Sequence, residues 1–240
     1  MRSKLIVFVL MAALCSGLQA KRIGDDGAAA NAATRGVHDE AMRILGSIKT
    51  TEYRHKTDID EKKGAYYCDC SGFVGYVLSR TVTTDGRKGP LANGKSRPLA
   101  MDYEKFFEAA PSKAGGDGQW QRIERVVDAR AGDVIAWRHE VPKPGNTGHV
   151  VFVDQKPEVE KDGLVRVVVI DSTTLPSADI SGDKGKSGIG RRTMWFTVDK
   201  DGRPVGYVRG KRSAKPKVEA ISIGRAMPTK AKISTVRRAA

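Results

Sequence analysis

Three residues whose types suit nucleophilic catalysis follow one another along the chain: Cys70, His149 and Asp171. A thiolate is a strong nucleophile, an imidazole can remove the thiol proton, and a carboxylate can orient the imidazole and stabilise its charged form. Residues of these types in the order Cys, His, Asp predict a thiol hydrolase.

The residues after Cys70 predict a buried helix that begins close to it. Apolar residues recur there at helical spacing, and Asp69 is a suitable N-cap. Cys70 then lies in the first helical turn, where the helix dipole and a nearby imidazolium would lower the pKa of its thiol. The apolar positions are Phe73, Val74, Val77 and Leu78.

His149 and Asp171 belong to two short runs of β-branched residues. His149 opens the predicted strand 149–153, and Asp171 follows the predicted strand 164–170. Side chains alternate between the faces of a strand, so a hairpin of these two strands would bring both residues to one face. Asp154 is a weaker candidate for the orienting role, and the Asp-Ser-Thr-Thr sequence at Asp171 is also compatible with a turn.

The elements around these residues predict an α+β fold. Helices are expected at residues 34–49 and 101–109, and further strands at 132–137, 194–198 and 205–209. Residues 199–204 contain Asp-Gly and predict a hairpin connection. Residues 138–147, with two prolines, are expected to form a long loop beside the cleft. Helices followed by a meandering antiparallel sheet give one catalytic domain over residues 34–210.

The first twenty residues have the pattern of a secretory signal peptide. Arg2 and Lys4 precede ten apolar residues, and small residues follow up to Ala20. A membrane anchor is the alternative, but a spanning helix needs about 20 apolar residues. Cys15 would leave with the signal. We therefore expect an exported, periplasmic or extracellular protein, with a flexible lead-in at residues 21–33.

The formal net charge of +14 is concentrated at the C-terminus, where residues 211–240 hold nine Lys or Arg and one Glu, hence +8. This segment predicts a basic, disordered tail. It would either be a solvated extension or bind anionic wall polymers or lipid surfaces. Nucleic acid is not an expected partner of an exported protein.

Cys68 lies two residues before the nucleophile and has two further interpretations. Cys-x-Cys with a histidine resembles part of a zinc site, but structural zinc usually takes four Cys or His ligands. A Cys68–Cys70 disulfide would close a very tight loop. It would inactivate Cys70 and could therefore serve as a redox switch. We expect no metal and no other cofactor.

Three segments resemble the NlpC-like cell-wall cysteine peptidases and, more loosely, the related CHAP amidases. They are Asp69-Cys70-Ser71-Gly72-Phe73-Val74, Gly132-Asp133-Val134-Ile135-Ala136-Trp137 and Gly148-His149-Val150. The resemblance covers about residues 35–175. It implies a papain-like fold of the NlpC type, with N-terminal helices packed on an antiparallel sheet. Cys70 and His149 would be nucleophile and base on amide bonds of peptidoglycan stem peptides.

The same resemblance implies a tyrosine upstream of the nucleophile that helps to form the oxyanion hole. Tyr53, Tyr66 and Tyr67 compete for this role, and Tyr53 is preferred; Ser71 is a second, weaker candidate for oxyanion or substrate binding.

Two other functions remain open from the sequence. An amidase, deamidase or acyl transferase would use the same catalytic residues on another amide substrate, since only the pocket differs. A non-catalytic wall-binding protein would act through the basic tail alone.

Overall fold

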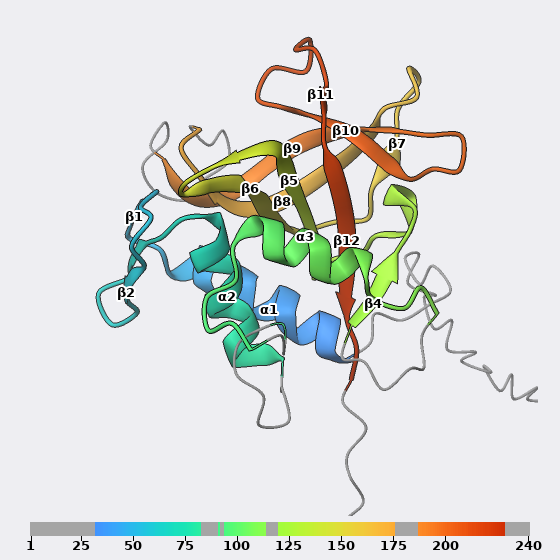
Figure 1. Ribbon diagram of the computed structural model, residues 1–240. Coiled ribbons are helices and arrows are strands. Elements are labelled where there is room, and N and C mark those ends of the chain that lie inside the picture. Colours follow the sequence, from blue (N-terminus) through green and yellow to red (C-terminus); the bar gives the residue numbers. More distant parts are fainter. Residues whose placement is uncertain (1–31, 83–90, 92–93, 114–119, 176–186, 229–240) are drawn as a thin grey trace, which may run out of the picture.

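Helices come first along the chain and a large antiparallel sheet follows them in the computed structural model (Figure 1). The structure describes residues 32–82, 91, 94–113, 120–175 and 187–228. The predicted signal peptide and residues 21–31 of the predicted lead-in lie outside the described residues. No helix in the described ranges is long and apolar enough to cross a membrane.

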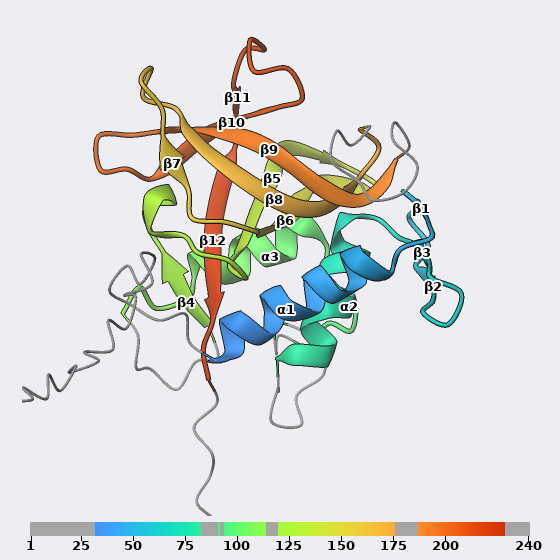
Figure 2. The same cartoon turned by 180° about the vertical axis from the view of Figure 1, so that it is seen from behind.

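The two predicted helices and the helix at Cys70 are confirmed, with small changes at their ends. They are α1 (Ala32–Ser47), α2 (Cys70–Thr81) and α3 (Ala100–Glu108). Helix α1 buries one face against α2, and both helices lie against one side of the large sheet (Figures 1 and 2). This packing fixes the N-terminal end of α2 beside the sheet.

A small sheet precedes α2 in a segment whose sequence has no clear periodicity. It consists of β1 (Thr50–Glu52), β2 (Asp58–Asp60) and β3 (Ala65–Tyr67) in the order β1-β3-β2. Strand β3 leads directly into α2 through residues 68 and 69, so this sheet controls the path by which the chain enters the helix.

The large sheet contains all five predicted strands, most of them longer than expected. Its main path runs β11-β10-β9-β8-β6-β5-β12-β4, every pairing is antiparallel, and β7 pairs with β8. A short 3-10 helix, Val126–Asp128, follows β4. The strands are β4 (Trp120–Ile123), β5 (Val134–Lys143), β6 (Asn146–Val153), β7 (Glu158–Val159), β8 (Val165–Thr173), β9 (Gly188–Val198), β10 (Pro204–Arg209), β11 (Lys217–Val218) and β12 (Ala220–Ala226).

The expectation of a long loop at residues 138–147 is wrong, because β5 and β6 continue through it as a hairpin. The pairing shifts between Arg138 and Lys143. This irregularity accommodates Pro142, which has no backbone N–H for a ladder hydrogen bond. The turn contains Gly145 at a φ of 75°.

The prediction of a disordered tail beginning at residue 211 is also wrong. Strand β12 lies inside the sheet between β5 and β4, with Ile221 and Ile223 on the buried face. Arg225 forms a bidentate ion pair with the buried Asp133, at 2.7 and 2.9 Å. The basic residues of this segment suggested a tail, although its apolar positions alternate as in a strand. Of the predicted tail, only residues 229–240 lie outside the described residues.

The two faces of the large sheet bury two separate sets of side chains. One face packs on the helices, as in the contact between Phe73 of α2 and Phe152 of β6. The other face curls around a core of its own that includes Trp137, Met194 and Tyr207. Strand β10 lies against β12, which closes this curl. The fold is α+β, with the helices on one side and a strongly bent antiparallel sheet.

Candidate active site

The Asp-Cys-Ser-Gly sequence forms the N-terminal turn of α2. Asp69 is the N-cap, and its Oδ1 atom accepts hydrogen bonds from the backbone N–H of Gly72 at 2.7 Å and from the Ser71 hydroxyl at 2.9 Å. A Cβ atom on Gly72 would lie only 2.4 Å from the Thr57 hydroxyl oxygen. Each residue of the sequence thus helps to place Cys70 as the first residue of the helix, as predicted.

The second oxygen of Asp69 is held by Arg97. Arg97 Nη2 lies 2.7 Å from Asp69 Oδ2 and 2.8 Å from the carbonyl oxygen of His55. His55 Nδ1 is 3.5 Å from the same carboxylate oxygen. A cation therefore balances the capping carboxylate beside the nucleophile. The sequence offered no signal for Arg97, which lies in a Gly- and Lys-rich segment.

The Cys70 side chain is buried, with the residue 5% exposed. Burial raises the pKa of its thiol to about 12, and the negative charges of Asp69 and Asp171 act in the same direction. The backbone N–H groups of Val150 and Ser71 favour the thiolate and oppose this shift. The expected low pKa is thus wrong for the resting protein, since desolvation outweighs the helix N-terminus and Cys70 is a neutral thiol.

His149 and Asp171 meet on the curled face of the sheet, as the strand order predicts. His149 Nε2 lies 2.7 Å from Asp171 Oδ2, and the residues are 6% and 0% exposed. Burial lowers the pKa of His149 despite the hydrogen bond to Asp171, so the imidazole is neutral at rest. The backbone N–H of Val150, the residue after His149, and the charge of Asp171 both act on the Cys70 thiol, which places the thiol near the strands that carry His149 and Asp171.

Gly148 is required by the local geometry of β6. Its φ is 145°, and a Cβ atom there would lie 1.9 Å from the carbonyl oxygen of Trp137. Trp137 pairs with His149 across β5 and β6, and their ring centroids are 5.1 Å apart. The glycine lets the two strands approach closely enough for the indole to support the imidazole.

Asp171 has a second partner, Arg192, which the sequence reasoning missed. Arg192 Nη1 donates to Asp171 Oδ1, on the side of the carboxylate away from His149. Burial raises the pKa of Asp171, but the Arg192 charge and the His149 hydrogen bond outweigh it and hold that pKa below its usual range. Arg192 also donates to the carbonyl oxygens of Gly188, Gly190 and Leu175. The available sequence signal for Arg192 was a charged residue two positions before Met194, at which the predicted strand begins.

Ser172 connects the strand that carries Asp171 to the segment that precedes the nucleophile. Its hydroxyl donates to the carbonyl oxygen of Cys68 at 2.6 Å. Residues 171–173 belong to β8, so the Asp-Ser-Thr-Thr sequence continues the strand and does not form a turn at Asp171. Cys68 and Cys70 are both free thiols, and burial raises the pKa of Cys68 to about 12. Within the described ranges, no group of three His, Cys, Asp or Glu could hold a metal ion.

Several alternative candidates lie away from this cluster or are engaged elsewhere. Asp154 pairs with His38 at 3.0 Å and with Arg191 at 2.9 Å. Tyr66 shares a hydrogen bond with Ser47, Tyr67 with Thr50, and the Ser71 hydroxyl serves the helix cap.

Tyr53 lies at the cluster. Burial raises the pKa of its phenol and the charge of Asp69 acts in the same direction, which keeps the phenol protonated.

A pocket of about 300 Å³ opens beside His149. The Tyr207 ring packs on Trp137 at 4.4 Å between centroids, and Trp137 in turn packs on His149, so aromatic rings form one wall. Tyr53, directly after β1, and Arg209, at the end of β10, contribute to the lining. The lining residues are Tyr53, His55, Trp137, His139, Asn146, Gly148, His149, Thr173, Thr174, Tyr207, Arg209 and Lys217.

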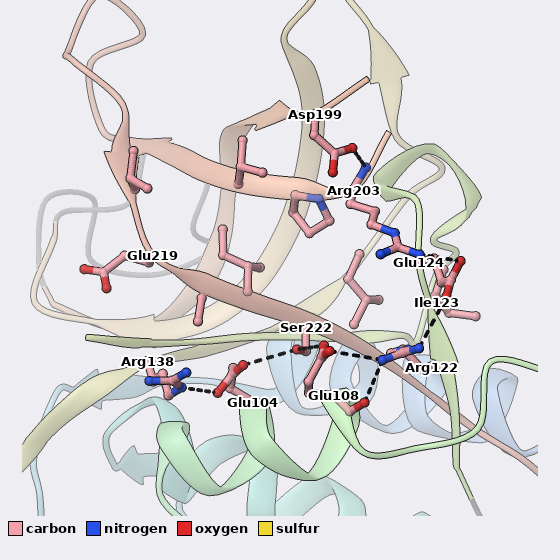
Figure 3. A pocket seen from close by; sticks show the side chains of 16 residues that line it. Glu104, Glu108, Arg122, Ile123, Glu124, Arg138, Asp199, Arg203, Glu219 and Ser222 are labelled. Atoms are coloured by element: carbon pink, nitrogen blue, oxygen red, sulfur yellow. Dashed lines mark hydrogen bonds and ion pairs between the residues drawn. The ribbon is translucent and has the colours of Figure 1, made fainter. Parts of the chain in front are cut away.

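A larger pocket, of about 510 Å³, lies at α3, β10 and β12 (Figure 3). Its charged side chains are paired with one another: Glu104 with Arg138 at 2.7 Å, and Glu108 with Arg122 at 3.1 Å. Ser222 donates to both glutamates. The pocket contains no cysteine or histidine among its described lining residues, so its chemistry is that of a structural ion-pair network.

Comparisons with known proteins identify no family. No protein-family model matches the sequence. The chain is 26% identical over 183 residues to a protein of Acanthamoeba polyphaga mimivirus named uncharacterized protein R653, covering 65% of this chain and 78% of that protein. The crystal structure of the wild-type endolysin LysIME-EF1 aligns with a TM-score of 0.35 and 19% identity, over 74% of this chain and 65% of the endolysin chain. That TM-score is too low to support an argument about fold or function.

Proposed function

We propose that this chain is an exported, papain-like cysteine hydrolase that cleaves amide bonds in peptidoglycan stem peptides. The observation that carries the proposal is the buried His149–Asp171 pair, 2.7 Å apart, together with a buried thiol at the first residue of α2 that feels the charge of Asp171. The resemblance of the three motifs to NlpC-like peptidases supports the choice of a cell-wall substrate.

The first half of the reaction acylates the thiol. His149 Nε2 is bonded to Asp171, which leaves Nδ1 to take the proton of Cys70 as its sulfur attacks the amide carbonyl carbon. A sulfur–carbon bond forms and the carbonyl becomes an oxyanion. The carbon–nitrogen bond then breaks, and the His149 imidazolium donates its proton to the leaving amine.

The second half hydrolyses the thioester. A water molecule gives a proton to His149 and attacks the carbonyl carbon, after which the carbon–sulfur bond breaks and Cys70 regains its proton. Since thiol and imidazole are both neutral at rest, the proton moves during the attack. The imidazole therefore acts as a general base in each attack and as a general acid when the amine and then the thiol leave.

Two further groups have roles that follow from their positions. Asp171, fixed by Arg192, holds the imidazole with Nε2 protonated and stabilises its charged form. The oxyanion would be stabilised by the Tyr53 hydroxyl and by the backbone N–H of Cys70, because first-turn N–H groups have no acceptor within their own helix.

The test is to incubate the protein, its Cys70→Ala variant and its Cys68→Ala variant with peptidoglycan fragments, and to identify the products by mass spectrometry. We expect cleavage by the wild type and by Cys68→Ala. Cys68 is also a buried free thiol, so Cys68→Ala is the matched control for the loss of a thiol close to the site. Cys70→Ala should yield no product. Cleavage that persists in Cys70→Ala would refute the assignment of the nucleophile. Absence of cleavage in all three would refute the peptidoglycan substrate.

A further inference from the structure

The pocket beside His149 carries positive charge that the proposed reaction does not use. Arg209 and Lys217 line it, and its described lining residues include no aspartate or glutamate. Three carboxylate groups that contact residues near the pocket are already engaged: Asp69 with Arg97, Asp171 with Arg192, and Glu219 with His139 at 2.9 Å. A negatively charged group that enters this pocket therefore meets uncompensated cations.

Arg209 is directed toward the catalytic residues by the register of β10. It is the last residue of the strand and pairs with Met194, while Tyr207, two residues earlier, pairs with Phe196. Side chains two residues apart share a face, so Arg209 follows Tyr207 onto the curled face where Trp137 and His149 lie. Its positive charge lowers the pKa of His149, which is consistent with a position close to the imidazole.

No described residue forms a hydrogen bond or an ion pair with the Arg209 guanidinium. The Arg192 guanidinium on the adjacent strand, by contrast, is buried and holds Asp171. Arg209 is partly exposed at the pocket. Lys217 of β11 pairs with Tyr207 and adds a second, exposed cation at the same opening. A guanidinium with five N–H donors is suited to bidentate binding of a carboxylate.

We propose that Arg209, assisted by Lys217, forms a subsite that binds a free carboxylate of the substrate next to the amide bond that is cleaved. This inference rests on the proposed function and specifies its substrate: acidic peptides that carry an unamidated carboxylate close to the scissile bond. Arg209 is then a specificity residue, because it selects and orients the substrate and takes no part in proton transfer.

The test uses two peptides, Ala-γ-D-Glu-Lys with a free α-carboxylate on the glutamate and the same peptide with that carboxylate amidated. Binding to the Cys70→Ala protein is measured by calorimetry, and cleavage by the active protein is measured by mass spectrometry. We expect the free carboxylate to bind about 10- to 100-fold more tightly, as hydrogen bonds to charged groups typically allow. Arg209→Gln should abolish this preference, and Arg209→Lys should retain part of it.

Arg203→Gln is the matched control. Arg203 is an exposed arginine just before the start of the same strand, it pairs with Glu124, and it lines the other pocket. It should leave the preference unchanged. Equal binding of both peptides to the Cys70→Ala protein, no binding of the acidic peptide, or an unchanged preference in Arg209→Gln would each overturn the subsite.

The two proposals fail in different ways. If the active protein cleaves both peptides equally well, the subsite is wrong and the hydrolase stands. If the Cys70→Ala protein prefers the acidic peptide, but the active protein cleaves neither, the subsite stands and the hydrolase is wrong.

Discussion

The pair Asp171→Asn and Asp154→Asn tests the catalytic assignment against a control supplied by the fold itself. Each aspartate is buried, and each contacts one histidine and one arginine. Only Asp171 holds the histidine that we propose as the base for Cys70. A purely structural role predicts similar behaviour of the two variants, whereas a catalytic role predicts that hydrolysis is lost in one of them.

The expected loss of activity follows from the tautomer of His149. In Asp171→Asn, the amide oxygen faces the Arg192 donor, so the amide N–H₂ faces Nε2 of the imidazole. Nε2 must then accept a hydrogen bond, and the proton moves to Nδ1, where it blocks removal of the thiol proton. By analogy with the same change in serine proteases, hydrolysis should fall on the order of 10³- to 10⁴-fold.

Stability must be measured beside activity, because both variants remove a charge that balances a guanidinium. The side chain of Arg192 is 7% exposed and that of Arg191 is 33% exposed. Leaving a buried charge unpaired costs about 3 kcal/mol, which corresponds to a decrease in Tm of roughly 6–12 °C for a chain of this size. Asp171→Asn should approach this loss, and Asp154→Asn should lose less.

Hydrolysis is compared at a temperature at which thermal unfolding shows all proteins to be folded. Asp154→Asn should then retain activity within a few-fold of the wild type. If Asp171→Asn is as active as the wild type, or if the two variants lose activity equally, Asp171 does not orient the base.

Three further predictions concern packing, pH and the C-terminal strand. Gly148→Ala should destabilise the protein by about 3 kcal/mol in chemical denaturation, and Gly145→Ala, which has open space around it, by about 1 kcal/mol. Because burial lowers the pKa of His149 below 6.5, the unfolded chain binds more protons than the folded chain just below pH 6.5. Stability and hydrolysis should therefore both fall as the pH decreases through this range, and hydrolysis should stay level up to about pH 9; an alkaline decline would indicate a resting thiolate–imidazolium pair. Deletion of residues 211–240 should unfold the protein by circular dichroism, and deletion of residues 229–240 should not.

Local patterns in the sequence identify the parts of the site that depend on local structure. The helical spacing after Cys70 and the N-cap preference of Asp69 are short-range properties, so they predicted the helix and its first residue. Strand alternation placed His149 and Asp171 on a common face. Arg192 and Arg209 depend on strand pairing across β8, β9 and β10, which no single segment encodes.

Two of the three errors, the disordered tail and the low thiol pKa, have distinct physical causes. Lys and Arg in residues 211–228 suggested a solvated tail, but Arg225 is paired with Asp133, and Arg212 with Glu160 and Asp162. The low thiol pKa was expected from the helix dipole and imidazole alone. The sequence does not reveal how completely the thiol is buried, and desolvation is the larger effect.

The hydrogen bond from the Thr34 hydroxyl to the carbonyl oxygen of Ala226 joins residues 192 positions apart in the chain. Strand β12 must insert between β5 and β4 before this bond can form, so completing the sheet requires contacts of very long range. Proteins dominated by such contacts fold slowly. We therefore expect the nascent chain to remain without a finished sheet, and without hydrolytic activity, until residue 226 has been synthesised and has found its place.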